Sequence, residues 1–177
     1  MIIIVEGVDC GGKGWMAERL LKRIPNCYYI KHGNRPTNTS EFEIAKLHTS
    51  YKTMLKTYYQ AVQPIGGTLI MDRFYQSELV YGSMLRGYDP YKDPFYTELE
   101  SRVQHEPHLY LEIFAAEADI LKRMEIKGED YLKQEMVPKI MEGYLNYKKN
   151  HCRLNSLRIT SSDTNVNAIV EKYASTV

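Results

Sequence analysis

Residues 1–14 read Met-Ile-Ile-Ile-Val-Glu-Gly-Val-Asp-Cys-Gly-Gly-Lys-Gly, an apolar run followed at once by a glycine-rich segment. From Gly7 to Lys13 the spacing is G-x-x-x-x-G-K. Glycines at these positions let successive backbone N–H groups point at a phosphate, and the N-terminus of a following helix adds a favourable dipole. The apolar strand before the loop and the helical pattern after it favour this interpretation over a plain glycine-rich turn with an exposed lysine. We therefore predict that Met1–Trp15 binds phosphate.

The residue after Lys13 departs from this pattern. Gly14 stands where a Ser or Thr hydroxyl holds Mg²⁺ in loops of this kind, and glycine cannot replace that ligand. Two interpretations follow. Either the metal is held by water and a carboxylate such as Asp72, or the site binds nucleotide and catalyses poorly.

Length and composition bound the class of protein. The chain has 177 residues, of which 44% are apolar and 25% charged, and its net formal charge is +1. We predict a single domain over residues 1–177, and we expect neither nucleic acid nor a membrane as a partner, because a nearly neutral chain attracts neither in general. Three cysteines without metal-site spacing are typical of a reducing compartment, and the opening apolar run is too short for a signal peptide. We expect a cytoplasmic protein.

Short apolar runs alternate with longer segments of helical period, a pattern typical of a parallel sheet with helices on both faces. Strands are predicted at Ile2–Glu6, Cys27–Lys31, Thr68–Met71, Leu109–Phe114 and Leu157–Thr160. Helices are predicted from near Gly12 to Pro25, at Glu41–Val62, Phe74–Arg86, Phe95–Gln104, Ala116–Lys127 and Tyr131–Lys149, and over Val166–Tyr173. Ligands bind such sheets at the carboxyl ends of the strands.

Two aromatic features have a structural interpretation. Tyr51, Leu55, Tyr58 and Tyr59 lie at helical spacing, which favours a core-facing stripe over a surface that stacks bases. Trp15, directly after the loop, is interpreted as a core anchor for the first helix, with a contact to adenine as the alternative.

A second polar segment, Asp72-Arg73-Phe74-Tyr75-Gln76-Ser77-Glu78-Leu79-Val80-Tyr81, follows the third predicted strand. Asp-Arg alone is a common dipeptide and usually forms a surface ion pair. At the end of a strand beside the glycine loop, however, Arg73 is placed to bind a second phosphate with two parallel hydrogen bonds. The two segments together indicate an enzyme that brings two phosphate groups together.

These two segments resemble those of thymidylate kinase, within the wider group of P-loop nucleoside and nucleotide kinases. That family's pattern is E-G-x-D-x-x-G-K followed by D-R-[YFH]-x-x-S-x-x-A-Y. It is matched here by Glu6, Gly7, Asp9, Gly12 and Lys13, and by Asp72, Arg73, Phe74, Ser77 and Tyr81. Weaker similarity extends over nearly the whole chain. The resemblance implies a three-layer P-loop kinase fold with a five-stranded parallel sheet, a short lid around residues 123–135, a homodimer, and the use of ATP and Mg²⁺.

The resemblance also implies roles for single residues. Lys13 and the loop amides would hold the ATP phosphates, Arg73 the acceptor phosphate, and Asp9 would lie near the acceptor sugar and the metal. Tyr81 would pack against the sugar, and His48 and Lys52 stand where the family has a base-stacking aromatic and a base-reading arginine. The predicted catalytic residues are Lys13, Asp9, Arg73 and Lys127, the last as the lid cation. The predicted cofactor-binding residues are Gly7, Cys10, Gly11, Gly12, Lys13, Gly14, Trp15 and Arg123. Those predicted to bind substrate are Asp9, Arg35, His48, Lys52, Asp72, Arg73, Ser77, Glu78 and Tyr81, and those predicted to hold metal are Asp72 and Asp9.

The function predicted from these patterns is transfer of the ATP γ-phosphoryl group to a pyrimidine deoxynucleotide, either dTMP or a related, modified dUMP. One alternative is a deoxynucleoside kinase, which needs a carboxylate after the second strand to deprotonate a sugar hydroxyl. No acidic residue occurs between His32 and Ser40, and Glu41 is the nearest candidate. The other alternative is a nucleotide-binding protein with weak or no kinase activity.

Overall fold

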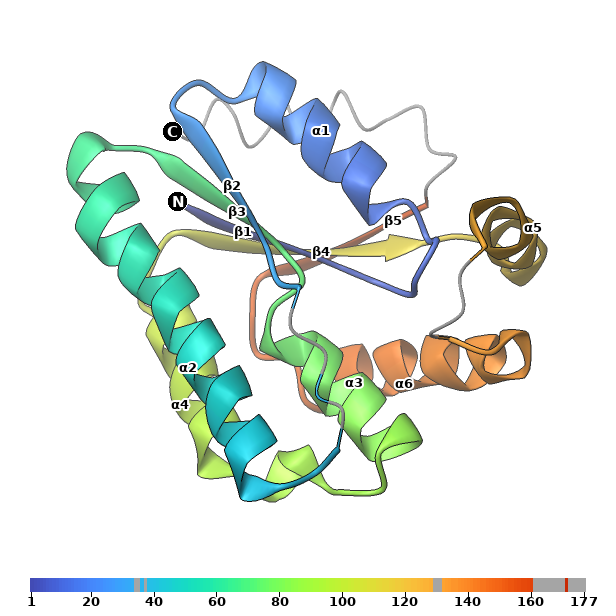
Figure 1. The fold of residues 1–177 in the computed structure, drawn as a ribbon. Coiled ribbons are helices and arrows are strands. Elements are labelled where there is room, and N and C mark those ends of the chain that lie inside the picture. The colour runs from blue at the N-terminus through green and yellow to red at the C-terminus, as the bar shows by residue number, and fades with distance from the viewer. Residues whose placement is uncertain (34–35, 37, 129–131, 161–170, 172–177) are drawn as a thin grey trace.

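The five predicted strands form one parallel sheet in the order β2-β3-β1-β4-β5 (Figure 1). The computed structural model describes residues 1–33, 36, 38–128, 132–160 and 171. The strands are β1 (Ile2–Glu6), β2 (Cys27–Lys31), β3 (Thr68–Asp72), β4 (His108–Phe114) and β5 (Ser156–Thr160). Because β1 lies between β3 and β4, all five of its residues are buried, which explains its nearly continuous apolar sequence.

Helices connect the strands at the predicted places. They are α1 (Lys13–Arg23), α2 (Glu41–Thr57), α3 (Tyr75–Leu85), α4 (Pro94–Gln104), α5 (Glu117–Lys127) and α6 (Val137–Asn150). Four short helical turns accompany them: η1 (Tyr58–Val62), η2 (Gln63–Ile65), η3 (Pro90–Lys92) and η4 (Gln134–Met136).

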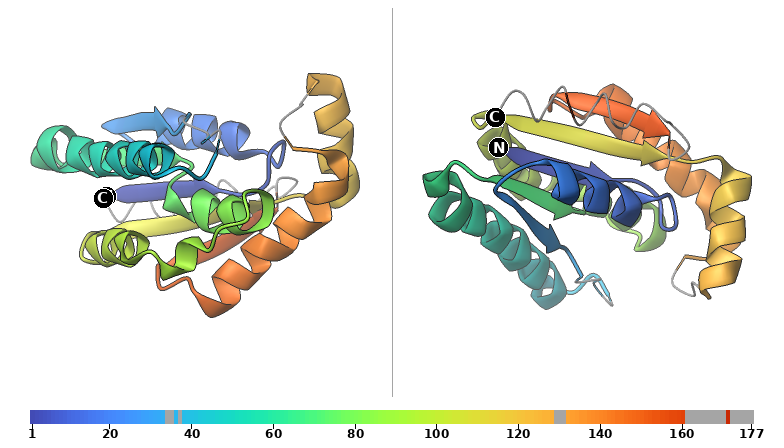
Figure 2. Two further views of the ribbon diagram at one scale, coloured as in Figure 1. Left: turned by 60° about the horizontal axis from the view of Figure 1, so that its bottom comes forward. Right: turned by 90° about the horizontal axis from the view of Figure 1, so that it is seen from above.

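Alternate residues of β1 divide the core into two layers. Ile3 and Val5 pack with Met16 and Leu20 of α1 on one face of the sheet. Ile2 and Ile4 belong to the larger cluster on the other face, where α2, α3, α4 and α6 lie (Figure 2). The predicted three-layer fold with helices on both faces is therefore confirmed. Helix α5 lies beyond the carboxyl ends of β1 and β4, and its Ile120 and Met124 join the larger core cluster (Figure 1).

One helix boundary differs from the prediction because of a proline. Helix α6 begins at Val137 rather than Tyr131, because Pro138 lacks a backbone N–H and is tolerated only in a first turn. The last predicted helix, Val166–Tyr173, falls almost entirely on residues outside the described part of the chain. The predicted aromatic stripe is confirmed as core-facing at Tyr51 and Leu55 of α2 and at Tyr58 of η1, which are at most 3% exposed.

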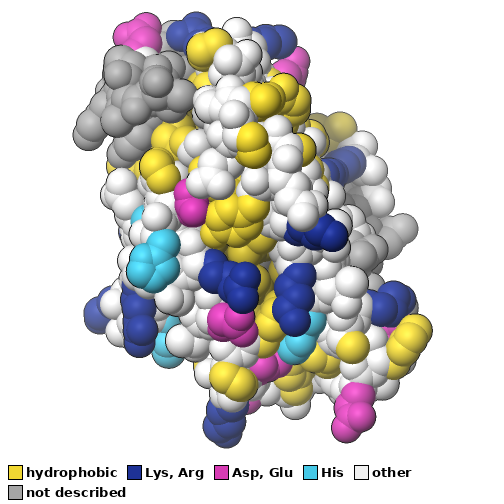
Figure 3. Space-filling model, turned by 90° about the vertical axis from the view of Figure 1, so that its left-hand side faces the viewer, with side chains coloured by type: hydrophobic (Ala, Val, Ile, Leu, Met, Phe, Trp, Pro, Cys, Tyr) yellow, Lys and Arg dark blue, Asp and Glu magenta, His cyan; other side chains and the backbone are white. Residues whose placement is uncertain are grey.

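The surface carries both signs of charge. Figure 3 shows Lys and Arg side chains interspersed with acidic and apolar ones on the face at the left of Figure 1, where α2 and α4 lie. None of the helices in the described part of the chain combines the length and the apolar composition that a bilayer crossing requires.

The glycine loop supplies a matched pair of substitutions that tests the close approach of its backbone to β4. Gly7 has φ +143°, and a Cβ built there would lie 2.3 Å from the Ile113 carbonyl oxygen. We expect Gly7→Ala to lower the free energy of unfolding by about 3 kcal/mol, as strained and overpacked positions do. A Cβ at Gly14 meets nothing within 4 Å, so Gly14→Ala should instead stabilise helix α1 by about 0.5 kcal/mol. Urea unfolding measures both, and equal midpoints for the two variants would contradict this packing.

Candidate active site

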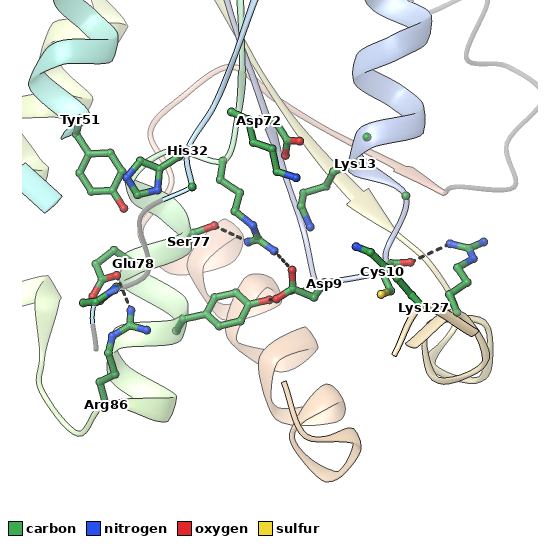
Figure 4. A pocket seen from close by; sticks show the side chains of 18 residues that line it. Asp9, Cys10, Lys13, His32, Tyr51, Asp72, Ser77, Glu78, Arg86 and Lys127 are labelled. Carbon is green, nitrogen blue, oxygen red and sulfur yellow. Dashed lines mark hydrogen bonds and ion pairs between the residues drawn. The ribbon is translucent and has the colours of Figure 1, made fainter. Parts of the chain in front are cut away.

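A cavity of about 580 Å³ opens at the carboxyl ends of the strands, a volume in the range of small-molecule sites. Its wall combines the glycine loop, the ends of β2 and β3, and the inner turns of α2, α3 and α5. Figure 4 shows Lys13, Cys10 and Lys127 at one end, Asp9 and Ser77 in the middle, and His32, Tyr51, Glu78 and Arg86 at the other end. The two segments that the sequence singled out therefore line one cavity.

Lys13 at the start of α1 is buried and turned back onto its own loop. Its Nζ donates hydrogen bonds to the carbonyl oxygens of Gly7 and Val8, at 2.9 and 2.8 Å. Burial, and next the positive charge of Arg73, lower the Lys13 pKa to about 7, although nearby carboxylates oppose the shift. A negative ligand in the cavity would favour the ammonium form, because its charge would offset the hydration that Lys13 loses on burial.

Glu6, the last residue of β1, joins the loop to the segment that follows β3. It is fully buried, and its carboxylate accepts hydrogen bonds from the backbone N–H groups of Phe74 and Ser77, at 2.8 and 3.1 Å. The Ser77 hydroxyl and the Tyr144 hydroxyl also donate to it, at 2.7 and 2.9 Å. The N-cap side chain of α3 makes no such bond, so a carboxylate from another strand satisfies the first turn of this helix.

Arg73, which directly follows β3, lines the cavity. Its guanidinium donates to the Asp9 carboxylate at 2.6 Å and to the Ser77 hydroxyl at 2.8 Å. The Asp9 carboxylate also accepts from Tyr81 at 3.2 Å, and the Arg73 guanidinium lies 5.3 Å from the centre of the Tyr81 ring. The Arg73 backbone has φ 68°, a conformation that L-residues adopt at a cost and that often marks functional turns. These contacts hold the guanidinium in one orientation.

Asp72, the last residue of β3, presents one carboxylate oxygen without a hydrogen-bond partner. Its Oδ2 accepts from the Tyr29 hydroxyl at 2.8 Å, whereas its buried Oδ1 has no partner in the described part of the chain. Burial, and next the hydrogen bond to Asp72, raise the Tyr29 pKa above its usual value, so Tyr29 remains a donor. Asp72 also lines the cavity beside Lys13 (Figure 4).

The far end of the cavity contains a second ion pair and a ring stack. Arg86 and the Tyr88 hydroxyl both donate to the Glu78 carboxylate. The His32 ring stacks on Tyr51 with 4.6 Å between ring centres. Burial, followed by the charge of Arg73, lowers the His32 pKa to about 4, so its imidazole is neutral at neutral pH.

Helix α5 brings two further cations to the glycine loop. Arg123 donates to the Cys10 carbonyl oxygen at 3.2 Å, and Lys127 lines the same end of the cavity. Both belong to the segment predicted as a lid. Residues 129–131 of that segment lie outside the described part of the chain, and the lid stays a prediction.

Other predicted site residues lie elsewhere. Trp15 is 38% exposed with the Arg19 guanidinium 4.2 Å from its ring centre, so its interpretation as a core anchor is wrong. The His48 ring stacks on Phe95 at 3.7 Å, and the Lys52 ammonium lies 5.4 Å from the same ring.

Trp15, His48 and Lys52 are all absent from the described lining of the cavity, and their binding roles stay predictions. Arg35 lies outside the described residues.

Six residues of the described cavity wall were not among the predicted site residues: Lys31, His32, Gly33, Pro36, Tyr51 and Arg86. His32 directly follows β2, and position at the carboxyl end of a strand was the available signal. Arg86 follows Glu78 by eight residues, a spacing that places both on one face of a helix. Tyr51 faces the core as predicted, and it also lines the cavity. The helical spacing of apolar residues predicts a core-facing side chain but does not show that the core borders a cavity there.

The sheet order, the glycine loop and the helix that follows it define a P-loop kinase fold. Comparison with solved structures agrees. Deoxyadenosine kinase from M. mycoides, with products dCMP and dCDP bound, aligns over 99% of this chain and 100% of its own, with a TM-score of 0.68 and 14% identity. The YorR protein of Bacillus subtilis, in complex with phosphorylated GDP, aligns over 98% of this chain and 93% of its own, with a TM-score of 0.70 and 20% identity. At these identities the likeness establishes the fold alone.

Sequence comparison points to the same relative. The SPbeta prophage-derived uncharacterized protein YorR of Bacillus subtilis (strain 168) is 26% identical over 149 residues, which are 84% of this chain and 82% of the relative. No protein-family model matches the chain. These comparisons support the P-loop nucleotide kinase fold, and the assignment to thymidylate kinase stays a prediction.

The charge balance around Arg73 can be tested by a double substitution. Arg73→Met leaves the carboxylates of Glu6 and Asp9 buried without their cation, and we expect the free energy of unfolding to fall by about 3–5 kcal/mol. Adding Asp9→Asn removes one of these charges and should restore at least about 1 kcal/mol. Urea unfolding of the two single variants and the double variant gives the coupling. If the losses of the two single variants simply add in the double variant, the two side chains do not interact.

Proposed function

We propose that this protein is an ATP-dependent nucleoside monophosphate kinase, which transfers the ATP γ-phosphoryl group to the phosphate of a nucleotide. The observation that carries the proposal is one cavity lined both by the glycine loop with Lys13 and by the fixed guanidinium of Arg73. The first is a site for a nucleoside triphosphate and the second a site for another phosphate. Such a cavity brings donor and acceptor together.

Transfer between phosphates requires positioning and charge neutralisation, because the attacking group is already an oxygen anion. Lys13 and the loop amides would hold the donor phosphates. Arg123 and Lys127 line the cavity at the loop and would offset charge on the transferred group. Arg73, held by Asp9 and Ser77, would orient the acceptor phosphate.

The residues present fit a magnesium ion bound through Asp72. Its buried Oδ1 lacks a hydrogen-bond partner in the described part of the chain, and Asp72 lines the cavity together with Lys13. Mg²⁺ keeps several waters and needs only one or two carboxylates, so Gly14 does not preclude binding. When bound, the ion would supply positive charge to the phosphates. Asp9 is the second predicted ligand, and its carboxylate is already shared by Arg73 and Tyr81.

The acceptor proposed from the family resemblance is a pyrimidine deoxynucleotide, dTMP or a modified dUMP. Tyr81 supports a deoxyribose, because its buried hydroxyl bonds to Asp9 beside Arg73 and would leave little room for a ribose hydroxyl. The base end of the cavity includes Glu78, whose carboxylate already accepts from Arg86 and Tyr88. A homodimer and a cytoplasmic location are proposed from the same resemblance and the cysteine content.

A nucleoside acceptor is the second candidate, since a deoxyadenosine kinase shares this fold. That reaction needs a base to deprotonate a sugar hydroxyl. The residue at the end of β2 is His32, whose pKa near 4 makes it a poor base, and Glu41 is exposed on the first turn of α2. The monophosphate acceptor therefore agrees better with the cavity.

Incubation with ATP and Mg²⁺ against a panel of nucleosides and nucleoside monophosphates tests the proposal. We expect diphosphate products from one or more deoxynucleotides and none from nucleosides. Asp72→Asn should lower the rate at least about 100-fold, because it removes the proposed metal ligand. Ser83→Ala is the control, since its hydroxyl bonds only within α3 and it is not among the cavity-lining residues. Turnover of nucleosides alone would overturn the proposal, and binding without any turnover would favour a nucleotide-binding protein.

Proton uptake on nucleotide binding tests the role of Lys13. With a pKa near 7, Lys13 is mostly neutral in the free protein at about pH 8, and triphosphate binding raises that pKa. Calorimetry in buffers of different ionisation enthalpy, with a non-hydrolysable ATP analogue, should therefore detect uptake of nearly one proton at about pH 8. Little uptake is expected at about pH 6. Affinity should fall about tenfold per pH unit above 7.

Lys13→Met is the control for protons exchanged by the ligand itself. In this variant the uptake at about pH 8 should vanish. Equal uptake with and without Lys13 would mean that the lysine does not contact the phosphates.

A further inference from the structure

His32 is a buried polar side chain that the proposed phosphate chemistry does not use. It directly follows β2, and its backbone N–H donates to the Asp72 carbonyl oxygen at 2.9 Å, which extends the sheet by one residue. Its side chain lines the cavity and is only 8% exposed, and its Nε2 has no hydrogen-bond partner in the described part of the chain. A buried nitrogen without a partner destabilises the free protein, and a ligand that hydrogen bonds to it would remove that cost.

The surroundings of His32 keep its ring in place. The ring stacks on Tyr51 with an angle of 26° between the planes, and Tyr51 is itself packed edge-on against Phe74 and Tyr96. Tyr51 belongs to the core cluster beneath the sheet, so the histidine lies on a rigid base. A rigid ring presents its nitrogen in a defined direction, which is a requirement for discriminating between ligands.

The charges around His32 indicate what kind of group it meets. Arg73 and Lys13 line the same cavity, and a guanidinium and an ammonium are stronger partners for a phosphate than the single imidazole nitrogen of His32. The neighbouring guanidinium of Arg86 is paired with Glu78. The group that meets His32 is therefore uncharged.

The position of His32 identifies that group. In Figure 4, Lys13 and the glycine loop lie at one end of the cavity, and Asp9 and Ser77, which hold Arg73, lie between them and His32. Consider an acceptor nucleotide whose phosphate binds Arg73 on the side of the glycine loop. Its base then extends away from the loop, toward His32, Tyr51 and Glu78. A planar base with a hydrogen-bonding edge suits a cavity end made of aromatic rings and paired polar groups.

We propose that His32 is a specificity-determining residue, whose Nε2 hydrogen bonds to the base of the acceptor nucleotide. The inference rests on the proposed function, since it requires an acceptor nucleotide in this cavity. The residues that discriminate between bases would then include His32 after β2, in addition to His48 and Lys52, the residues of α2 predicted to contact the base.

The test compares two probes that share a phosphate and differ in the base. One is the deoxynucleoside monophosphate that the wild-type protein phosphorylates best, and the other is deoxyribose 5-phosphate, which has no base. His32→Phe keeps a ring that can stack on Tyr51 but removes the nitrogen. We expect it to weaken monophosphate binding about tenfold and to leave deoxyribose 5-phosphate binding unchanged, with both affinities measured by NMR titration.

Two further variants complete the experiment. His151→Phe makes the same substitution at a histidine that stacks on Tyr91, with 4.2 Å between ring centres, and is not among the described cavity-lining residues, so neither affinity should change. His32→Gln replaces the ring by an amide that both donates and accepts. It should bind deoxyribose 5-phosphate as the wild type does, while the order of preference among monophosphates with different bases changes.

The outcomes separate this inference from the proposed function. Equal losses for both probes in His32→Phe, or no loss for either, would overturn the role of His32 even if the kinase activity is intact. An unchanged order of bases in His32→Gln would also contradict it. A wild-type protein that binds and phosphorylates no monophosphate would instead overturn the proposed function, and with it the assignment of His32.

Discussion

The structure depends on the contact between the Glu6 carboxylate and the first turn of α3. Glu6 ends the central strand β1, whereas α3 follows the neighbouring strand β3, so the contact joins two segments about seventy residues apart in sequence. The carboxylate satisfies backbone N–H groups that would otherwise be buried without partners, in the place of an N-cap side chain. As a result, the loop after Glu6 and Arg73 before α3 are held at one edge of the sheet.

A cluster of buried charges results from this arrangement. Carboxylates of Glu6, Asp9 and Asp72 lie near the cations of Lys13 and Arg73 at the ends of β1 and β3. Such charges are costly to bury unless they are paired, and here Arg73 is paired while Lys13 donates only to carbonyl oxygens of its own loop. Burial, and next the positive charge of Arg73, lower the Lys13 pKa. A phosphate ligand would supply the missing negative charge, so the energetic cost in the free protein becomes affinity for the ligand.

Local sequence predicted the fold well because the parallel sheet is encoded by short apolar runs. All five strands occur where Ile2–Glu6 and its counterparts indicate, and the loop at Gly7–Gly14 connects strand to helix as the motif requires. The start of α6 was wrong because the helical period alone does not show how Pro138 limits the first turn. Trp15 was misplaced for a related reason. Whether an aromatic residue faces the core or solvent depends on which neighbour covers it, and the Arg19 guanidinium lies over its ring at the surface.

The sequence by itself determined the alternation of strands and helices, the glycine-rich loop and the second polar segment at Asp72–Tyr81. These are local properties, since each depends on the order of apolar residues, on glycines that allow a tight turn, or on residues a few positions apart. Only the tertiary structure decided that Glu6 holds α3, that His32 and Tyr51 form one end of the cavity, and that His48 lies against Phe95 instead. Those relations join residues on different strands and helices, and they follow from the order in which the strands pair and from the side chains packed between them.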